Sequence, residues 1–172
     1  MVDEDRRIIA HLFRRAGFGA APAEIDAATA VGYEATVDDL LYPEGHERPQ
    51  EDLLERFHSE HRDEESPRWS ALKWVYRMIN SDRPLEEKMA LMWHGVFATG
   101  WAKVTNGQMM SRQYEMLRDS GLSGFGMLLQ KLSRDPAMIY WLDQHTNHAD
   151  AVNENYGREL LELFSMGRGN YT

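Results

Sequence analysis

The chain has 172 residues, which suits a single domain that buries about two-thirds of its unfolded surface, and 42% of them are hydrophobic, as in globular proteins. The net charge of −9 is concentrated in residues 1–65, which carry 17 acidic and 7 basic side chains, and this acidity argues against nucleic-acid binding. No run of about eighteen apolar residues is present to span a membrane, and the absence of cysteine excludes disulfides and thiolate metal sites.

The N-terminal part of the chain predicts short helices separated by glycine and proline. Acidic side chains in the first turn favour a helix that starts at Asp3 and ends before Gly17. Pro22 suits the first turn of a second helix, which closes at Gly32. The helices expected in this part cover residues 3–16, 22–30, 34–41 and, as a polar segment, 50–62.

Tryptophan and methionine are concentrated after residue 69, so we expect the main core there. The helix that begins near Pro84 carries a predicted buried stripe of Leu85, Met89, Met92, Trp93, Val96 and Phe97. The pair Asp135-Pro136 provides a capping oxygen and a first-turn proline. Further helices are expected over residues 69–80, 108–118, 124–132, 136–142 and 153–166. Because no segment alternates with the period of a strand, the sequence predicts an all-α, irregular multi-helix domain over residues 1–172.

The last predicted helix carries the densest polar cluster of the chain. At 100° per residue, one sector of it holds Asn155, Glu159, Glu162 and Met166. Two carboxylates one turn apart can bind a hard cation or act as an acid/base pair. The alternative is structural, because Arg158 stands four residues from both Glu154 and Glu162, the spacing of surface ion pairs.

Histidines do not complete a metal site in this sequence. A carboxylate-bridged di-metal centre needs histidine three residues after its glutamate, and neither Glu159 nor Glu162 has one. His-x-x-His pairs occur only in polar segments, where exposure is more common than metal binding, at His58/His61 and His145/His148. We therefore predict no metal and no cofactor.

The first helix offers two adjacent guanidinium groups, Arg14 and Arg15, together with His11. Arginine binds carboxylate or phosphate through two parallel hydrogen bonds, so this group, with Asn155, is either an anion site or part of an internal ion pair. A carboxylate that faces a core is costly unless it is paired. We therefore predict that Glu159 or Glu162 pairs with Arg14 or Arg15.

Four motifs occur in one order along the chain: His11–Gly19, Pro84–Phe97, Arg134–Met138 and Asn153–Phe164. The series resembles the bacterial family catalogued as domain of unknown function 1800. The resemblance implies a helical protein, commonly exported and often encoded beside a sulfatase-like protein, with no established activity or catalytic residues. Family members are typically more than twice as long and carry an export signal that this chain lacks, so we expect the N-terminal part of a longer family domain or a short member.

Two functional hypotheses follow. The first is a non-catalytic helical module that packs on a partner, such as the sulfatase-like protein or a missing C-terminal segment. The second is a metal-assisted or acid/base hydrolase that uses His94, Glu159 and Glu162, with His11 and Arg15 binding an anionic group. The sequence favours the first, because no nucleophile elbow, phosphate-binding loop or kinase signature occurs in it.

Overall fold

The computed structural model describes residues 2–50, 52–57 and 66–171, and this part of the chain is built from helices. Its only β-type pairing is an isolated bridge between His148 and Ala151, so the predicted all-α class is confirmed. No helix among these residues is both long enough and apolar enough to cross a bilayer. The chain divides into two compact units: unit 1 consists of the described residues within 1–59 and 72–88, and unit 2 of those within 60–71 and 89–172. A single domain over residues 1–172 stays a prediction.

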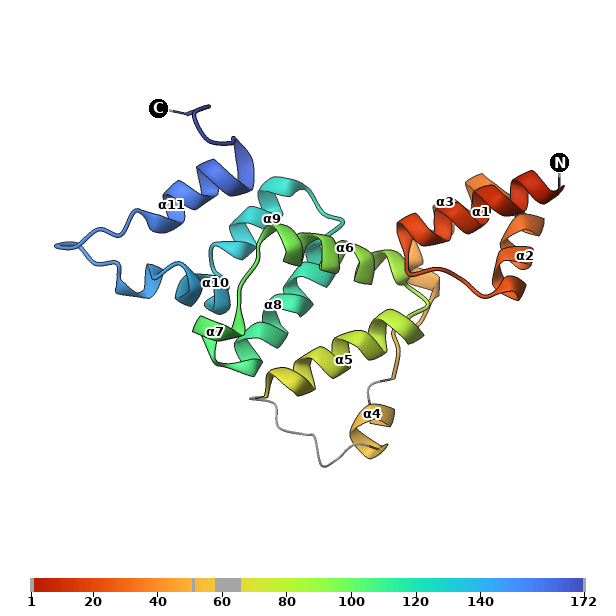
Figure 1. The fold of residues 1–172 in the computed structure, drawn as a ribbon, viewed down its shortest axis with the longest axis horizontal. Coiled ribbons are helices and arrows are strands. Elements are labelled where there is room, and N and C mark those ends of the chain that lie inside the picture. The colour runs from red at the N-terminus through yellow and green to blue at the C-terminus, as the bar shows by residue number, and fades with distance from the viewer. Residues whose placement is uncertain (1, 51, 58–65, 172) are drawn as a thin grey trace. The chain divides into compact units, whose positions relative to one another are not determined.

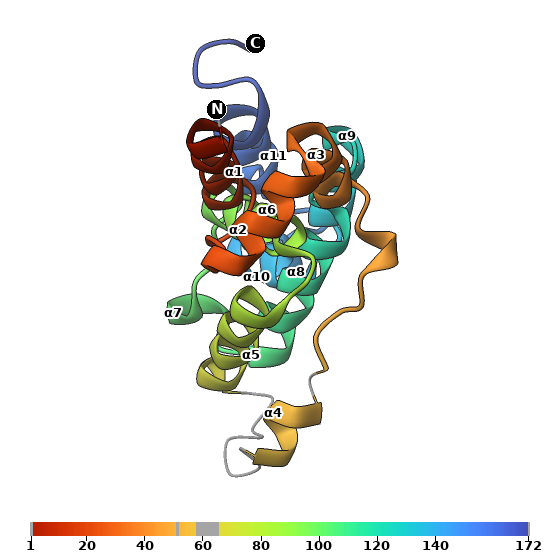
Figure 2. The same ribbon diagram turned by 90° about the vertical axis from the view of Figure 1, so that its right-hand side faces the viewer.

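Unit 1 begins with three helices that pack on one another, drawn in red to orange in Figures 1 and 2. They are α1 Val2–Ala16, α2 Pro22–Val31 and α3 Tyr33–Leu41. Each helix contributes one buried apolar side chain, Ile9 from α1, Ala28 from α2 and Leu40 from α3, and each of these is less than a tenth exposed. Gly32 separates α2 from α3 with a φ of 98°, which glycine adopts without strain, and its N–H caps α2 at the carbonyl of Ala28.

The rest of unit 1 comes from later segments. The 3₁₀ turn η1 covers Pro43–Gly45, and the predicted polar helix appears as α4, Asp52–Phe57, while residues 58–62 lie outside the described residues. The end of α5 (Pro67–Asn80) and the first turn of α6 (Pro84–Val96) complete the unit. Gly17 lets the end of α1 approach Pro84 closely, because a Cβ atom there would lie 2.9 Å from the Cβ of Pro84.

Unit 2 contains the larger described core. Its elements are α7 Trp101–Val104, α8 Gly107–Ser120, α9 Phe125–Leu132, α10 Pro136–Trp141, η3 Gln144–Thr146 and α11 Asn155–Glu159, followed by the π-helical segment η4 Leu160–Ser165. Side-chain oxygens of Asn106 and Asp135 cap α8 and α10, the latter as predicted. The fully buried side chains include Phe97, Leu117, Leu128, Leu132 and Met138.

The buried face of α6 differs from the predicted one. Glu87 and Ala90 on α6 and Phe97 directly after it are buried at intervals of three and seven residues, whereas Met92 and Val96 are 44% and 43% exposed. Their assignment to the core was wrong. The stripe was assigned from apolar side chains, but the face that is buried includes a glutamate, which an apolar pattern cannot identify.

Trp93 lies at the border of this face and is half-buried. Its ring stacks on Phe97 at 5.2 Å between centroids and on Phe125 at 5.8 Å. Its indole N–H donates to the carbonyl of Gly121 over 2.8 Å, which satisfies the polar atom of a large apolar ring.

The last helix is also not the continuous α-helix that was predicted over residues 153–166. The α-helical part ends at Glu159, and the N–H of Met166 then donates to the carbonyl of Leu161, the i→i+5 bond of a π-helix. The Ser165 hydroxyl donates to the carbonyl of Leu160 at 2.6 Å, which supports the wider turn. The 100° periodicity therefore fails after residue 159, and the predicted common sector of Glu162 with Asn155 no longer follows from it.

Candidate functional site

A pocket of about 500 Å³ lies beside α11 in unit 2. Its lining consists of Gln144, Asn147, Asn153, Glu154, Tyr156, Gly157, Arg158, Leu161 and Tyr171. Most of these residues belong to the motif Asn153–Phe164, which therefore forms the wall of the pocket. The volume falls in the range of about 300–1,000 Å³ that is typical of binding sites.

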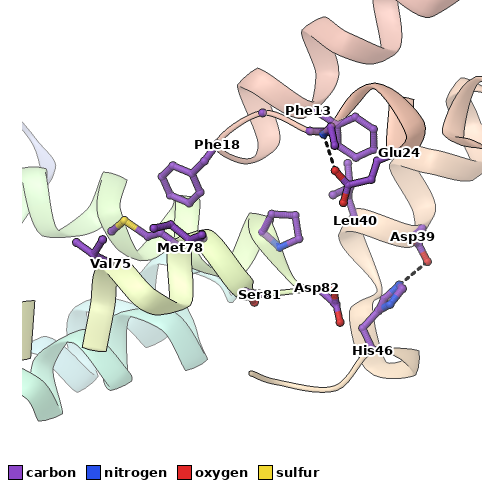
Figure 3. A pocket seen from close by; sticks show the side chains of 15 residues that line it. Phe13, Phe18, Glu24, Asp39, Leu40, His46, Val75, Met78, Ser81 and Asp82 are labelled. Atoms are coloured by element: carbon purple, nitrogen blue, oxygen red, sulfur yellow. Dashed lines mark hydrogen bonds and ion pairs between the residues drawn. The ribbon is translucent and has the colours of Figure 1, made fainter. Parts of the chain in front are cut away.

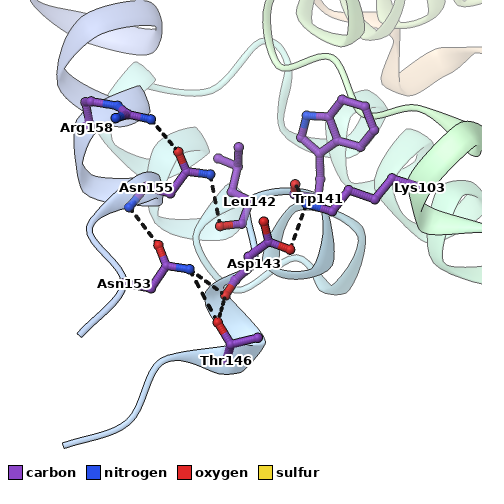
Figure 4. A network of polar contacts seen from close by, with 8 residues as sticks. All are labelled: Lys103, Trp141, Leu142, Asp143, Thr146, Asn153, Asn155 and Arg158. Atoms are coloured by element: carbon purple, nitrogen blue, oxygen red, sulfur yellow. Dashed lines mark hydrogen bonds and ion pairs between the residues drawn. The ribbon is translucent and has the colours of Figure 1, made fainter. Parts of the chain in front are cut away.

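Amide side chains fix the loop that precedes α11 (Figure 4). The side-chain NH₂ of Asn153 donates to the carbonyl of Asp143 at 3.0 Å, and its oxygen accepts from the N–H of Asn155 at 2.9 Å. The Asn147 oxygen accepts from the N–H of Asn153 at 3.2 Å. Asn153 thus anchors both sides of the loop, and α11 begins at Asn155, two residues after the start of the predicted helix 153–166. Asp143 itself has a φ of 58°, a left-handed conformation stabilised by this network.

A second group of contacts ties the start of α11 to the ends of α10 and α7 (Figure 4). Asn155 donates to the carbonyl of Leu142 at 3.3 Å and accepts from Arg158 at 2.7 Å. Lys103 on α7 donates to the carbonyl of Trp141 at 2.7 Å and pairs with Asp143 at 2.7 Å. The polar groups around the pocket are thereby held in one arrangement.

Two glutamates singled out from the sequence stand at the C-terminal side of this site. The side chain of Glu159 is 20% exposed, and its carboxylate lies 3.5 Å from the guanidinium of Arg158. Arg158 therefore forms its ion pair with the adjacent Glu159 and not, as the spacing suggested, with Glu154 or Glu162. Glu162 accepts from the hydroxyl of Tyr171 at 2.6 Å, and this hydrogen bond raises the pKa of Tyr171. Both carboxylates are therefore stabilised by donors within unit 2.

Two tyrosines and a histidine of unit 2 have pKa values shifted by burial. Burial raises the pKa of Tyr156 in the pocket wall and of Tyr114 on α8. His94 packs edge-on against Tyr114, with 5.0 Å between ring centroids, and its burial lowers its pKa below the ordinary value of 6.5. The imidazole is accordingly neutral at pH 7.

The N-terminal candidates belong to unit 1. His11, Arg14 and Arg15 all lie on α1 with exposed side chains. Glu159 and Glu162 belong to unit 2, so the ion pair expected between the two groups stays a prediction.

The loop histidines have separate surroundings. His145 stacks on Tyr140 at 4.7 Å, and Nδ1 of His148 lies 2.6 Å from the carbonyl oxygen of Thr146, which can only accept. Within the described ranges, no three histidine, aspartate or glutamate side chains gather in a metal-ligating arrangement. The pair His58/His61 lies outside the described residues.

Several residues of the site had no signal in the sequence. Lys103 and Asp143 are forty residues apart, and the contact between their elements depends on how α7 packs on α10. Tyr171 follows two glycines with positive φ, Gly167 and Gly169, which turn the chain back toward Glu162.

Comparison with known proteins gives one match. The sequence model of the family described as "Protein of unknown function (DUF1800)" matches residues 11–172. No curated protein and no solved structure matches the chain.

Proposed function

The chain belongs to the DUF1800 family, and we propose that it is a non-catalytic helical module that binds a protein partner through the pocket of unit 2 and the exposed side of its last helix. The observation that carries the proposal is the exposure of Leu163, which is 69% accessible in the π-helical segment directly after the pocket wall.

Further apolar exposure supports this assignment. Val152 before α11 is 72% exposed, and Met166 after the π-helical segment is 50% exposed. Large apolar side chains around a hollow with a polar lining are typical of protein-binding surfaces. The π-helical turn also supports a functional role for this segment, because such turns are rare and occur frequently at functional sites.

The polar side chains of the pocket support recognition more than chemistry. The side-chain amides of Asn153 and Asn155 donate hydrogen bonds to the carbonyls of Asp143 and Leu142. These bonds fix the loop and the start of α11, so the site is pre-organised for binding. Arg158 keeps a 57% exposed side chain at the pocket, where its remaining N–H groups can donate to a partner's carboxylate or carbonyl.

The family resemblance implies two candidate partners: a sulfatase-like protein of the kind often encoded beside family members, and the C-terminal segment of longer family members. The test is isothermal titration of each purified candidate into this chain. We expect one of them to bind and Leu163→Ser to weaken that binding about tenfold, since an apolar contact of this size is worth about 1.4 kcal/mol. Met127→Ser on α9 is the matched control, because Met127 is 55% exposed and lies outside the pocket.

Binding that is equal in Leu163→Ser and Met127→Ser, or binding of neither candidate, contradicts the proposal. A separate assay addresses the hydrolase alternative with a panel of ester and phosphate-ester substrates. If the chain hydrolyses one of them and Glu159→Gln abolishes the activity while Leu163→Ser retains it, the module is an enzyme and the non-catalytic assignment is wrong.

A further inference from the structure

Unit 1 contains a groove of about 620 Å³ that is unrelated to the pocket of unit 2 (Figure 3). It is bordered by the end of α1, the following loop and the first turn of α2, by the end of α3 and His46, and by the end of α5 with the loop that follows it. We propose that this groove binds a segment of a partner protein whose apolar side chains are followed by lysine or arginine.

One wall of the groove is apolar and open to solvent. Ile79 and Val75 on α5 are 75% and 50% exposed, and Phe18 after α1 is 42% exposed. Figure 3 shows Phe18 near Val75 and Met78, with Phe13 and Leu40 on the other side of the hollow. Three large apolar side chains exposed at one concave site are the anchors that an apolar segment requires.

The facing wall is acidic. Glu24, Asp39 and Asp82 line it, and the lining contains no lysine or arginine; Nε2 of His46 lies 2.8 Å from Oδ1 of Asp39. Asp82 is exposed and has no ion pair or side-chain hydrogen bond within the described part of the chain. This wall therefore complements a cationic side chain.

Two cationic side chains next to the groove, Lys88 and Arg83, already interact with other groups of unit 1. Lys88 lies over the ring of Phe18 at 5.0 Å. Arg83 donates to the carbonyl of His46 at 2.7 Å and pairs with Glu86 at 3.4 Å. Neither lines the groove, so the charge of its lining stays negative.

The backbone makes the groove a preformed feature. Glu24 accepts from the N–H of Ala21 and so closes the loop after α1, while Gly19 adopts a φ of 105° there. The N–H groups of Gly17 and Gly19 both donate to the carbonyl of Phe13 at the end of α1. A fixed loop lowers the conformational cost of binding.

The exposure of Ile79 favours a polypeptide over a small organic cation. Three-quarters of this side chain is accessible although it lines the groove, so the apolar wall continues onto the surface of α5. A ligand that covers this wall and also reaches Asp82 must carry several apolar groups and a positive charge. An amphipathic polypeptide segment with lysine or arginine meets both requirements.

The experiment uses a fluorescein-labelled leucine–lysine amphipathic peptide and its leucine–glutamate counterpart, titrated with the whole chain and followed by fluorescence anisotropy. We expect the lysine peptide to bind, the glutamate peptide to bind at least about tenfold more weakly, and both Ile79→Ser and Asp82→Asn to weaken the lysine peptide about tenfold. All the substituted side chains are exposed, and circular dichroism of each variant verifies that the helices are retained.

Matched controls separate the groove from general attraction to an acidic chain. Val31→Ser removes an apolar side chain 68% exposed at the end of α2, and Asp38→Asn removes an exposed carboxylate of α3 beside the groove; neither residue lines it. Equal losses in the groove variants and these controls, or no binding of the lysine peptide, overturn the proposal. Phenethylammonium that displaces the peptide and binds with similar affinity also overturns it, in favour of a small-cation site. Because Leu163→Ser lies in unit 2, its effect reports on the other proposal alone.

Discussion

Phe97 is the aromatic side chain that joins α6 to the last helix inside unit 2. It is 0% exposed, stacks on Trp93, and meets Phe164 edge-to-face with 5.2 Å between centroids. Offset and edge-to-face aromatic pairs add to the free energy of burial. Loss of this ring therefore removes both the burial and the contact with the π-helical segment.

Phe97→Ala is expected to lower the free energy of unfolding by about 3–5 kcal/mol, because the cavity in a packed core cannot collapse fully. Val96→Ala, one residue away and 43% exposed, should change it by no more than about 0.5 kcal/mol. Urea unfolding followed by circular dichroism measures both. Equal costs for the two variants would show that the helix face described for α6 is wrong.

Asp135 gives unit 2 a pH dependence that can be tested. It is 5% exposed, and burial raises its pKa above the ordinary 3.8, although its carboxylate accepts from the Met138 N–H and from Gln113. A carboxyl group with a raised pKa in the folded state contributes stability that is fully present below its unfolded pKa. That contribution is lost as the pH rises through the folded pKa.

Comparison with Asp135→Asn isolates this effect, because asparagine also caps a helix and has no titrating group. The stability of the parent relative to Asp135→Asn should fall as the pH increases from about 3.8 upward and then become constant above the folded pKa. Urea unfolding of both proteins across this pH range is the measurement. A difference that does not vary with pH, or that moves in the opposite direction, would contradict the prediction.

At the scale of elements, the close approach of α6 to the end of α8 depends on a glycine. A Cβ atom on Gly121 would lie 2.6 Å from the carbonyl oxygen of Leu117, 3.1 Å from the Trp93 ring and 3.2 Å from the Met89 Cβ. The first contact is with backbone and cannot be relieved by a side-chain rotation. Gly126, on α9, has no such neighbour within 4 Å.

Gly121→Ala is therefore expected to destabilise the protein by about 1–3 kcal/mol through overpacking. Gly126→Ala should instead stabilise it by up to about 1 kcal/mol, since alanine is the better helix former. Thermal unfolding of the two variants against the parent gives opposite signs if the packing is as described. Stabilisation of similar size in both variants would show that helix propensity decides the effect and that the crowding at Gly121 does not.

The first helix belongs to unit 1 and the last helix to unit 2. The side chain of Glu159 is only 20% exposed, and a partly buried carboxylate is stabilised by every cationic donor near it, of which Arg158, 3.5 Å away, is one. The predicted ion pair between α1 and the last helix would supply such a donor and connect unit 1 to unit 2.

A double-mutant cycle with Arg15→Met and Glu159→Gln tests this pairing, together with the combinations that use Arg14 and Glu162. We expect a coupling free energy of about 1 kcal/mol or more in at least one combination, because a partly buried pair interacts more strongly than a solvated one. Coupling near zero in all four combinations would show that the arginines of α1 serve another purpose.

Local signals along the chain determined where most helices begin and end. Asp135-Pro136 starts α10, Gly32 separates α2 from α3, and Pro84 opens α6, because capping oxygens, proline and glycine act on the backbone within one turn. The all-α class followed from the absence of any segment that alternates with the period of a strand. The motif Asn153–Phe164 also identified the segment that forms the wall of the pocket in unit 2.

Only the tertiary structure decided which faces are buried and which distant residues meet. The salt bridge of Lys103 with Asp143 and the groove that brings Phe18 to Ile79 join positions about forty and sixty residues apart, and no local pattern encodes such separations. The burial of Glu87 depends on what packs over α6. The π-helical turn that exposes Leu163 follows from no local pattern of the sequence either, and its Phe164 is buried and packs edge-on against Phe97.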